Sequence, residues 1–344
     1  KTIYVGTGES NSSRSSYPGV GILKSEDNGK NWQNVGLRDS HHISRIIITP
    51  KDSQHIVVAV IGHLYSKNNQ RGVFNSFDGG KTWGEKFVMQ KNIGKLNTMS
   101  LSFLRPAESN ELLMFVLIKN SKSDLDLVVC RSTDQAATWS KPHVITVEDG
   151  YHIMNNARAI QLSTGRILCP VSTTPLIHSS KHPLKNVCYY SDDAGKTWKR
   201  SQDAVAVPKR GAMEAGLVER RDGSLLQIIR TQMGKIWFSE SKDQGDSWSD
   251  AREWTLVSPE APATLISLPA DQGWLIIHNP VVDPKAKSHG GRRTPLVARV
   301  SKDEGKTWSR PVPIESDPTK TYSYISARIV GTRALLSYYV EAAR

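Results

Sequence analysis

An eight-residue pattern, Ser-x-Asp-x-Gly-x-Thr-Trp, recurs six times in this chain of 344 residues and restricts its fold more than any other feature. The copies begin at residues 25, 76, 132, 191, 241 and 301, so successive starts lie 51, 56, 59, 50 and 60 residues apart. A repeat of about this length suits one four-stranded blade of a β-propeller. Six matches to so long a pattern predict an all-β, six-bladed propeller.

The pattern has a local physical logic, and we call it the Asp box. Its Asp can accept hydrogen bonds from nearby backbone N–H groups, and its Gly supplies a backbone conformation that other residues resist. Its Trp can close over the turn and bury a large apolar face. Two copies depart from the pattern: Ala136 replaces the Gly of the third, and in the first Asn31 replaces the Thr or Ser that the other copies have. We expect the boxes to be structural and assign them no catalytic role.

A second repeat runs out of phase with the boxes. An apolar strand, a turn and another apolar strand precede each of the later boxes, and one further hairpin around residues 330–332 has no box after it. The first box, conversely, has little before it. We therefore expect the last blade to take its inner strands from residues 322–340 and its outer strands from the N-terminus, which would remove open sheet edges. No stretch shows a helical period, so one domain is expected to span residues 1–344.

The amino-acid composition gives only a coarse indication of the kinds of molecule that this protein binds. The net charge of +12 favours anionic partners, but the basic residues are scattered, so a solvated basic surface is an equally good interpretation. No apolar run is long enough for a membrane span, and no basic run indicates nucleic-acid binding. The chain begins without Met or a signal peptide, which suggests a processed or trimmed product.

The three cysteines, Cys130, Cys169 and Cys188, lie in strand-like runs. Their odd number and the absence of C-x-x-C spacing predict buried free thiols rather than disulfides or a zinc site. No metal-ligand spacing and no phosphate-binding loop occurs, so the sequence implies no metal and no cofactor.

Residues 87–344 resemble the bacterial sialidases (neuraminidases) and their Asp-box (BNR-repeat) relatives. Three segments carry the resemblance: residues 213–219 (MEAGLVE) leading into 222–230, residues 293–296 (RTPL) and residues 322–325 (YSYI). Residues 1–86 resemble Asp-box propellers of the sortilin-like class instead, through residues 4–10 (YVGTGES) and 62–66 (GHLYS). The chain is therefore interpreted as a natural fusion or an engineered chimera.

The resemblance implies exo-acting hydrolysis of terminal α-linked sialic acid with retention, by a secreted or periplasmic monomer. It makes Tyr322 the nucleophile and Glu214 its base, with Arg230 and Arg293 binding the substrate carboxylate. Guanidinium groups bind carboxylates through bidentate, charge-assisted hydrogen bonds. A neutral Tyr can attack beside that carboxylate without like-charge repulsion, and sialidases with a Tyr nucleophile are known exceptions to the two-carboxylate scheme.

Alternatives remain for each of these residues. The neighbouring Arg292 competes with Arg293, and three other tyrosines compete with Tyr322: Tyr324, Tyr338 and Tyr339. Arg230 is otherwise a surface arginine at a strand end, and Glu214 is otherwise a solvated carboxylate.

The first blade gives weaker candidates. By resemblance Arg45 is the third carboxylate-binding arginine, although an ordinary strand arginine is as good an interpretation. Residues 61–73 contain no Asp where the family places its acid, and offer His63, Asn68, Asn69 and Arg71. Asp124 resembles the acid/base motif one blade later. Arg158 is a further candidate, and the adjacent Ala157 stands where an acidic residue is expected, so the acid remains open.

The sequence is compatible with three functions. The first is the sialidase, whose partner would be a sialylated or other acidic glycan. The second is a non-catalytic propeller used for binding or as a scaffold. The third is a propeller lyase or hydrolase that acts on another acidic sugar. The fold alone does not choose among them, because propellers support many functions.

Overall fold

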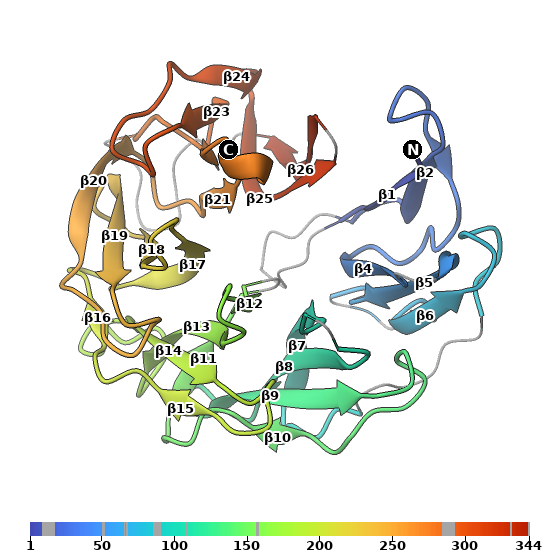
Figure 1. Ribbon diagram of the computed structural model, residues 1–344, viewed down its shortest axis with the longest axis horizontal. Coiled ribbons are helices and arrows are strands. Elements are labelled where there is room, and N and C mark those ends of the chain that lie inside the picture. The colour runs from blue at the N-terminus through green and yellow to red at the C-terminus, as the bar shows by residue number, and fades with distance from the viewer. Residues whose placement is uncertain are drawn as a thin grey trace. The chain divides into compact units, whose positions relative to one another are not determined.

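The computed structural model describes residues 1–8, 18–49, 52–64, 66, 68–84, 91–107, 109–155, 158–283, 293–330 and 332–342. Throughout these ranges the regular structure is β-strand, apart from one 3₁₀ turn at Pro269–Asp271 (Figure 1). The same residues contain no helix long and apolar enough to cross a membrane. An all-β fold is therefore confirmed.

The chain divides into two compact units. The first comprises Lys1–Val147 with Asn155–Ala159, and the second comprises Glu148–Met154 with Ile160–Arg344. The expectation of one domain over the whole chain stays a prediction.

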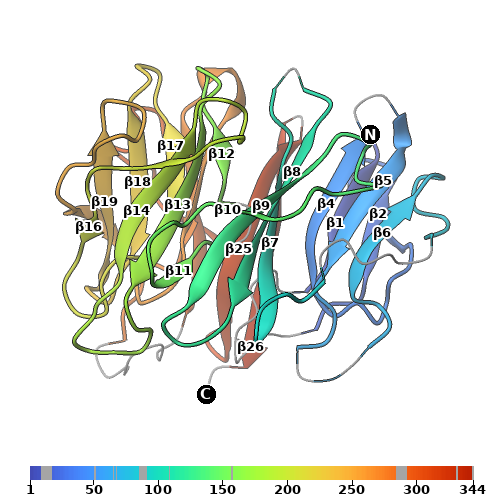
Figure 2. The same cartoon turned by 90° about the horizontal axis from the view of Figure 1, so that it is seen from below.

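The first unit contains three groups of antiparallel strands. They are β1 (Ile3–Gly6), β2 (Ile22–Ser25) and β3 (Gln33–Asn34); β4 (Ile43–Thr49), β5 (Asp52–Val60) and β6 (Gly72–Ser76); and β7 (Asn97–Leu104), β8 (Leu112–Lys119), β9 (Leu125–Ser132) and β10 (His143–Val144). Figure 2 shows β7, β8 and β9 side by side, with β8 in the middle. Residues 112–117 of β8 are all buried, which explains why this strand is a continuous apolar run rather than an alternating one.

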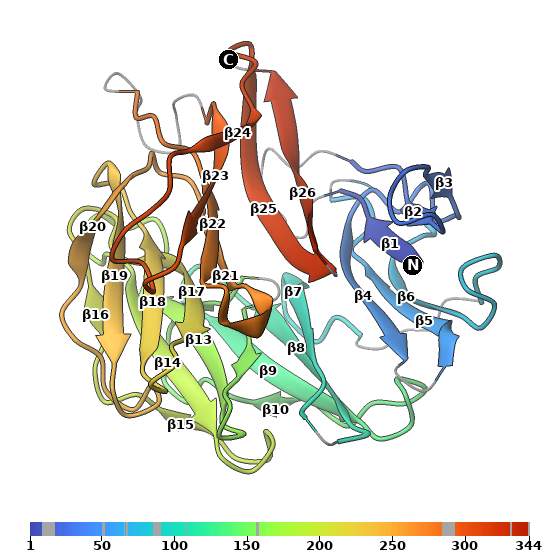
Figure 3. The same ribbon diagram turned by 45° about the horizontal axis from the view of Figure 1, so that its top comes forward.

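The second unit continues the same meander in four groups of strands. They are β11 (Tyr151–Ile153), β12 (Ile160–Gln161), β13 (Ile167–Thr174), β14 (Lys185–Ser191), β15 (Lys199–Arg200) and β16 (Val205–Ala206); β17 (Met213–Glu219), β18 (Leu225–Arg230), β19 (Lys235–Ser241) and β20 (Arg252–Val257); β21 (Thr264–Ser267), β22 (Trp274–His278), β23 (Leu296–Ser301) and β24 (Val312–Glu315); and the hairpin β25 (Lys320–Val330) and β26 (Arg333–Ala342). Strand β21 contacts both β17 and β25 (Figure 3), so residues from three consecutive sheets can meet beside it.

Apolar side chains hold neighbouring sheets of this unit together. Val218 and Ile228 of the β17–β20 sheet pack with Trp274 and Ile276 of β22, and Trp254 of β20 belongs to the same cluster. Burying a side chain of this size stabilises the fold by roughly 1.5–3 kcal/mol relative to leaving it exposed. These clusters fix the sheets that carry the site described below.

The Asp boxes form hydrogen-bonded turns at the ends of strands. In the fourth box, Asp193 accepts hydrogen bonds from the backbone N of Thr197 (2.8 Å) and from its Oγ1 (2.6 Å), and Ser191 Oγ donates to it (2.8 Å). The third box keeps this geometry without its glycine, because Ala136 adopts a φ of 71° and its N donates to Ser132 Oγ (2.9 Å). The structural role expected of the boxes agrees with these contacts.

The last box differs from the first, fourth and fifth in the tryptophan that donates to its glycine carbonyl. In the first, fourth and fifth boxes the Trp Nε1 donates to the carbonyl of the box glycine, for example Trp248 to Gly245 O at 3.1 Å. In the last box Trp254 of β20 takes that acceptor, donating to Gly305 O at 3.0 Å. Trp254 thus lies directly against Gly305, where a Cβ atom would stand 2.4 Å from Trp254 Cζ2.

We predict that Gly305→Ala lowers the free energy of unfolding by about 1–3 kcal/mol more than Gly223→Ala does. Both glycines have a positive φ, 88° and 79°, so both substitutions carry the backbone cost. Only Gly305 would also clash, since nothing lies within 4 Å of a Cβ at Gly223. Urea unfolding of the two variants measures the difference in the free energy of unfolding. Equal losses in the two variants would show that the Trp254 side chain moves aside without lowering the stability.

Candidate functional site

A buried arginine and a half-buried arginine of the second unit meet at one backbone carbonyl. Arg230 is the last residue of β18, and Arg293 lies shortly before β23. The Nη2 atom of each donates to the carbonyl oxygen of Glu260, at 3.2 Å from Arg230 and 3.1 Å from Arg293. The two guanidinium groups must therefore lie close together, although the Arg230 side chain is only 2% exposed.

Glu214 compensates this concentration of positive charge. Its Oε2 atom lies 2.7 Å from Arg230 Nη1. Burial opposes the charge on Arg230, but the nearby Glu214 carboxylate outweighs it, and the pKa of Arg230 is raised. The pKa of Arg293 is lowered, first by burial and then by the neighbouring charge of Arg230. With its side chain 20% exposed, Glu214 is the part of this pair that remains accessible.

A β-bulge aims Glu214 at the arginines. The register between β17 and β18 shifts between Met213 and Gly216, and Glu214 has a φ of 47°. Its backbone N donates to Ser172 Oγ (3.0 Å), and that hydroxyl donates to Asn186 Oδ1 (2.7 Å). Bulges redirect a side chain at a local conformational cost, so the buried Ser172–Asn186 pair helps to hold the strained residue.

Tyr324 stands on an equivalent bulge in β25. The register with β26 shifts between Ser323 and Ser326, and Tyr324 has a φ of 52°. Its ring centre lies 5.8 Å from the guanidinium carbon of Arg293. Burial and the negative charge of Glu214 raise the pKa of Tyr324, while Arg230 and Arg293 act in the opposite direction. The phenol is therefore neutral at neutral pH and lies within the electrostatic reach of all three charged groups.

The bulge itself is a feature of the fold rather than of the site. Strand β7 of the first unit carries the same irregularity at Ser100, which has a φ of 56° beside a register shift between Met99 and Ser102. The chemistry thus depends on which side chain occupies the bulge.

The backbone around Arg293 is fixed by neighbouring strands. Its N donates to Thr321 Oγ1 (2.8 Å), and its carbonyl accepts from Tyr322 N (2.8 Å) and Asn279 Nδ2 (2.8 Å). These bonds tie the segment before β23 to β25, so Arg293 and Tyr324 are positioned by the same strand.

The side-chain carboxylate of Glu260 is also bound by neighbouring residues. Arg210 pairs with its Oε1 atom, and Gln232 Nε2 donates to its Oε2 atom at 2.9 Å. The Glu260 side chain is 6% exposed, and this pairing offsets its burial. No sequence motif surrounds Glu260, so its role as the shared acceptor was not predicted.

The structure places Tyr322 in the core and brings a different tyrosine, Tyr324, against the arginines. Tyr322 is 1% exposed and packs in an apolar cluster with Leu275 and Ile277, with its ring 6.1 Å from that of Tyr338. Burial raises the pKa of its hydroxyl, and the acidic groups that contribute are Glu315 and Asp317 rather than Glu214.

The physical reason is the bulge at Tyr324. In a regular strand residues 322 and 324 would point to the same face, because side chains alternate with a period of two. The irregularity in β25 breaks the alternation, so Tyr322 faces the core while Tyr324 faces the arginines.

Among the competing residues, Tyr338 pairs its hydroxyl with Glu315. Tyr339 lies in β26, and Arg292 falls outside the described residues.

The remaining candidates belong to the first unit. Arg45 lies half-buried in β4 beside a register shift between Ile43 and Arg45. The Asp124 carboxylate accepts from Asn120 Nδ2 (3.0 Å), and its carbonyl accepts from Asn120 N (2.9 Å), so Asp124 closes a turn before β9. Arg158 lies in the short segment that completes this unit.

This combination of antiparallel sheets, Asp-box turns and an arginine-rich cluster defines an all-β repeat protein with the fold of known sialidases. The structure of the Trypanosoma rangeli sialidase in complex with the inhibitor DANA aligns with a TM-score of 0.63 at 17% identity, over 99% of this chain and 58% of that one. A protein of unknown function from Dyadobacter fermentans DSM 18053 aligns with a TM-score of 0.63 at 19% identity, over 89% of this chain and 92% of that one.

Residues 97–333 match the family described as BNR repeat-like domain. The chain belongs to this family. A sialidase of Bacteroides fragilis (strain YCH46) is 27% identical over 275 residues, which is 69% of this chain and 48% of that protein. The chain thus spans somewhat less than half the length of the curated sialidases that it matches.

We predict that Arg230→Met lowers the free energy of unfolding by about 3–5 kcal/mol, because it removes the positive charge that faces the largely buried Glu214 carboxylate. Adding Glu214→Gln should restore part of the loss, with a coupling free energy of about 0.5–3 kcal/mol. Urea unfolding of both single variants and the double variant measures this coupling free energy.

The matched control for this prediction is the exposed pair Lys235–Glu253, with side chains 42% and 46% exposed. Lys235→Met should cost no more than about 1 kcal/mol. Equal losses from the two pairs would contradict a structural role for the buried one.

Proposed function

We propose that this protein is a sialidase-like glycoside hydrolase that removes terminal α-linked sialic acid with retention of configuration. The observation that carries the proposal is the convergence of Tyr324, Glu214 and two arginines in one cluster of the second unit. The family membership and the 27% identity to curated sialidases support the same chemistry.

The two arginines would bind the substrate carboxylate. Their Nη2 atoms share a single carbonyl acceptor, which brings both guanidinium groups to one place where a substrate carboxylate could contact them. Arginine forms planar, bidentate hydrogen bonds with carboxylates and stays charged when buried, which suits it to this role better than lysine. By family resemblance Arg45 would be the third member of the set.

Tyr324, in place of Tyr322, would be the nucleophile. Its oxygen bonds to the anomeric carbon, its proton passes to Glu214, and the bond to the leaving oxygen breaks. Water then attacks the same carbon and the bond to the tyrosine oxygen breaks. The phenolate takes back its proton from Glu214, and the proton that water loses neutralises the departed leaving group. A neutral phenol avoids the repulsion that a carboxylate nucleophile would meet beside the anionic substrate. The raised pKa of Tyr324 requires a base, and Glu214 is the carboxylate whose charge acts on it.

The site has no well-placed candidate among the predicted residues for the acid that protonates the leaving oxygen. Asp124, the predicted acid, already accepts an amide hydrogen bond in its turn, and residues 61–73 contain no Asp. We therefore infer that the enzyme depends on substrates whose leaving groups need little protonation.

We further propose that the sheets are blades of a six-bladed propeller, with β1–β3 completing the blade of β25 and β26. Six boxes and the two-stranded β25–β26 sheet support this arrangement. The proposed protein is a secreted or periplasmic monomer whose partner is a sialylated or other acidic glycan, and the net charge of +12 would favour such a partner.

The nucleophile is tested by two tyrosine variants. Tyr324→Phe should lower kcat on a fluorogenic sialoside by at least about 10²–10⁴-fold, and Glu214→Gln should cost a similar factor. The double variant should lose little more, because the two groups act as one unit. Tyr322→Phe is the matched control and should keep its rate within a few fold. A dead Tyr322→Phe that folds normally, or an active Tyr324→Phe, would overturn the assignment.

The missing acid predicts a strong dependence on the leaving group. General acid catalysis typically contributes about 10²–10⁴-fold, so nitrophenyl sialosides should be hydrolysed while sialyl-galactosides are nearly inert. Comparing kcat/KM for the two substrate types measures the effect. Robust turnover of a sialyl-galactoside would show that an acid is present.

A further inference from the structure

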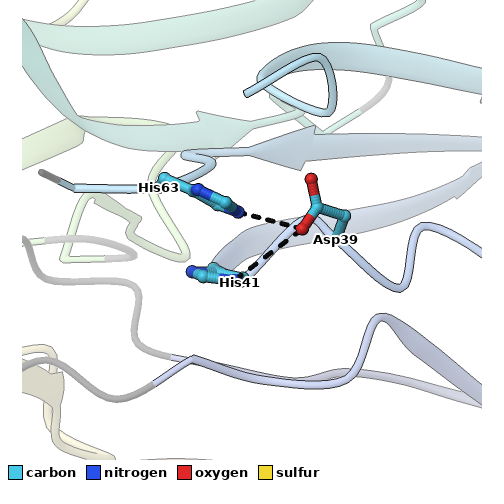
Figure 4. Close-up of side chains that lie close together, drawn as sticks. All are labelled: Asp39, His41 and His63. Atoms are coloured by element: carbon cyan, nitrogen blue, oxygen red, sulfur yellow. Dashed lines mark hydrogen bonds and ion pairs between the residues drawn. The ribbon is translucent and has the colours of Figure 1, made fainter. Parts of the chain in front are cut away.

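Three side chains with metal-ligating atoms meet in the first unit, apart from the arginine cluster of the second (Figure 4). The Nε2 atom of His63 lies 3.0 Å from Asp39 Oδ1, and the Nε2 atom of His41 lies 3.9 Å from the same oxygen. Asp39 and His41 come from the connection between β3 and β4, and His63 from the segment after β5. All the ligand atoms lie within 4.8 Å of one another.

We propose that Asp39, His41 and His63 bind one divalent transition-metal ion of the zinc type. Two imidazole nitrogens and one carboxylate oxygen are ligands that zinc and its neighbours prefer, whereas calcium and magnesium prefer oxygen alone. Zinc bonds of about 2.0–2.2 Å in a tetrahedral site place the donor atoms roughly 3.3–3.5 Å apart. The observed separations of 3.0 and 3.9 Å lie on either side of that value.

The two segments that supply the ligands are tied together by hydrogen bonds. Asp39 N donates to Gln70 Oε1 (2.8 Å), and Asn68 Nδ2 donates to Asp39 O (2.7 Å). On the other side, Arg71 Nη2 donates to His63 O (3.0 Å). The carboxylate and the imidazole are thus held at fixed positions before any ion binds, which lowers the cost of ordering them.

His63 also has the outer contact that orients a metal-binding histidine. Its Nδ1 lies 2.7 Å from Ser66 Oγ, which leaves Nε2 directed at Asp39. Metal-binding histidines usually use their second nitrogen in this way, and the contact fixes both the ring orientation and the tautomer.

His41 is the adjustable ligand. Its ring is stacked on that of His63, with centroids 3.6 Å apart and an interplanar angle of 23°. A metal lies in the plane of each ligating ring, so His41 must turn about its Cβ–Cγ bond to aim Nε2 at an ion bound by His63. The side chain is 31% exposed and has room for this rotation.

The arrangement favours a site with an open coordination position. Three protein ligands leave a fourth tetrahedral position for water, and the Asp39 side chain is 58% exposed. The residues come only from the first unit, so the inference does not rest on the proposed glycosidase activity. Bound metal would join the segment before β4 to the segment after β5.

Calorimetric titration of the untagged full chain with ZnCl₂, after treatment with a chelator, tests the proposal. We expect one ion per chain for the parent protein and loss of that binding in His63→Gln and in Asp39→Asn. Ser66→Ala, which removes only the outer contact, should weaken binding by about 10–100-fold. Titration with CoCl₂ should give the intense visible absorption of four-coordinate cobalt, and CaCl₂ should not compete.

His143→Gln is the matched control, because His143 is an exposed histidine of β10 in the same unit. It should bind zinc like the parent. Thermal unfolding without metal checks that each variant is folded. No binding by the parent, or equal binding by the parent and a folded His63→Gln, would overturn the proposal.

Discussion

Two guanidinium groups held next to each other, one buried and one half-buried, are the constraint on which the second unit depends. Such a pair repels itself and loses hydration, so it persists only where acceptors are supplied from several directions. Glu214 supplies a carboxylate to Arg230, and the Glu260 carbonyl accepts from both arginines. Because these acceptors come from β17 and from the segment before β21, neighbouring sheets must pack in one arrangement for the charges to be tolerated.

The same constraint explains why the site lies on irregular backbone. A regular strand offers side chains to its two faces in strict alternation, and both faces of these strands are needed for packing between sheets. The bulges at Glu214 and Tyr324 release one side chain from that alternation. The first unit repeats the device at Ser100, where the side chain cannot serve as acid, base or charged ligand in the same way. The fold thus supplies the positions, and the sequence determines which of them carry chemistry.

The two units differ in the kind of polar cluster that they contain. The second gathers arginines, carboxylates and a tyrosine, a set suited to an anionic sugar. The first gathers a carboxylate and two imidazoles on connections between strands, a set suited to a metal ion. This difference parallels the two sequence resemblances, which change near residue 86. It also means that the chemistry of one unit gives no guide to that of the other.

The sequence by itself determined the all-β class and the Asp-box turns, and its motifs pointed to Arg230 and Arg293. These features depend on contacts between residues close in the chain, such as those of Asp193 with Ser191 and Thr197, or on motifs that keep their spacing. Periodicity could not separate Tyr322 from Tyr324, because one bulge reverses which residue faces the core, and bulges leave no spacing signal. Glu260 and the Asp39–His41–His63 group were also invisible in the sequence. Their partners are distant along the chain and come together only when strands pair and sheets pack, so only the tertiary structure decided them.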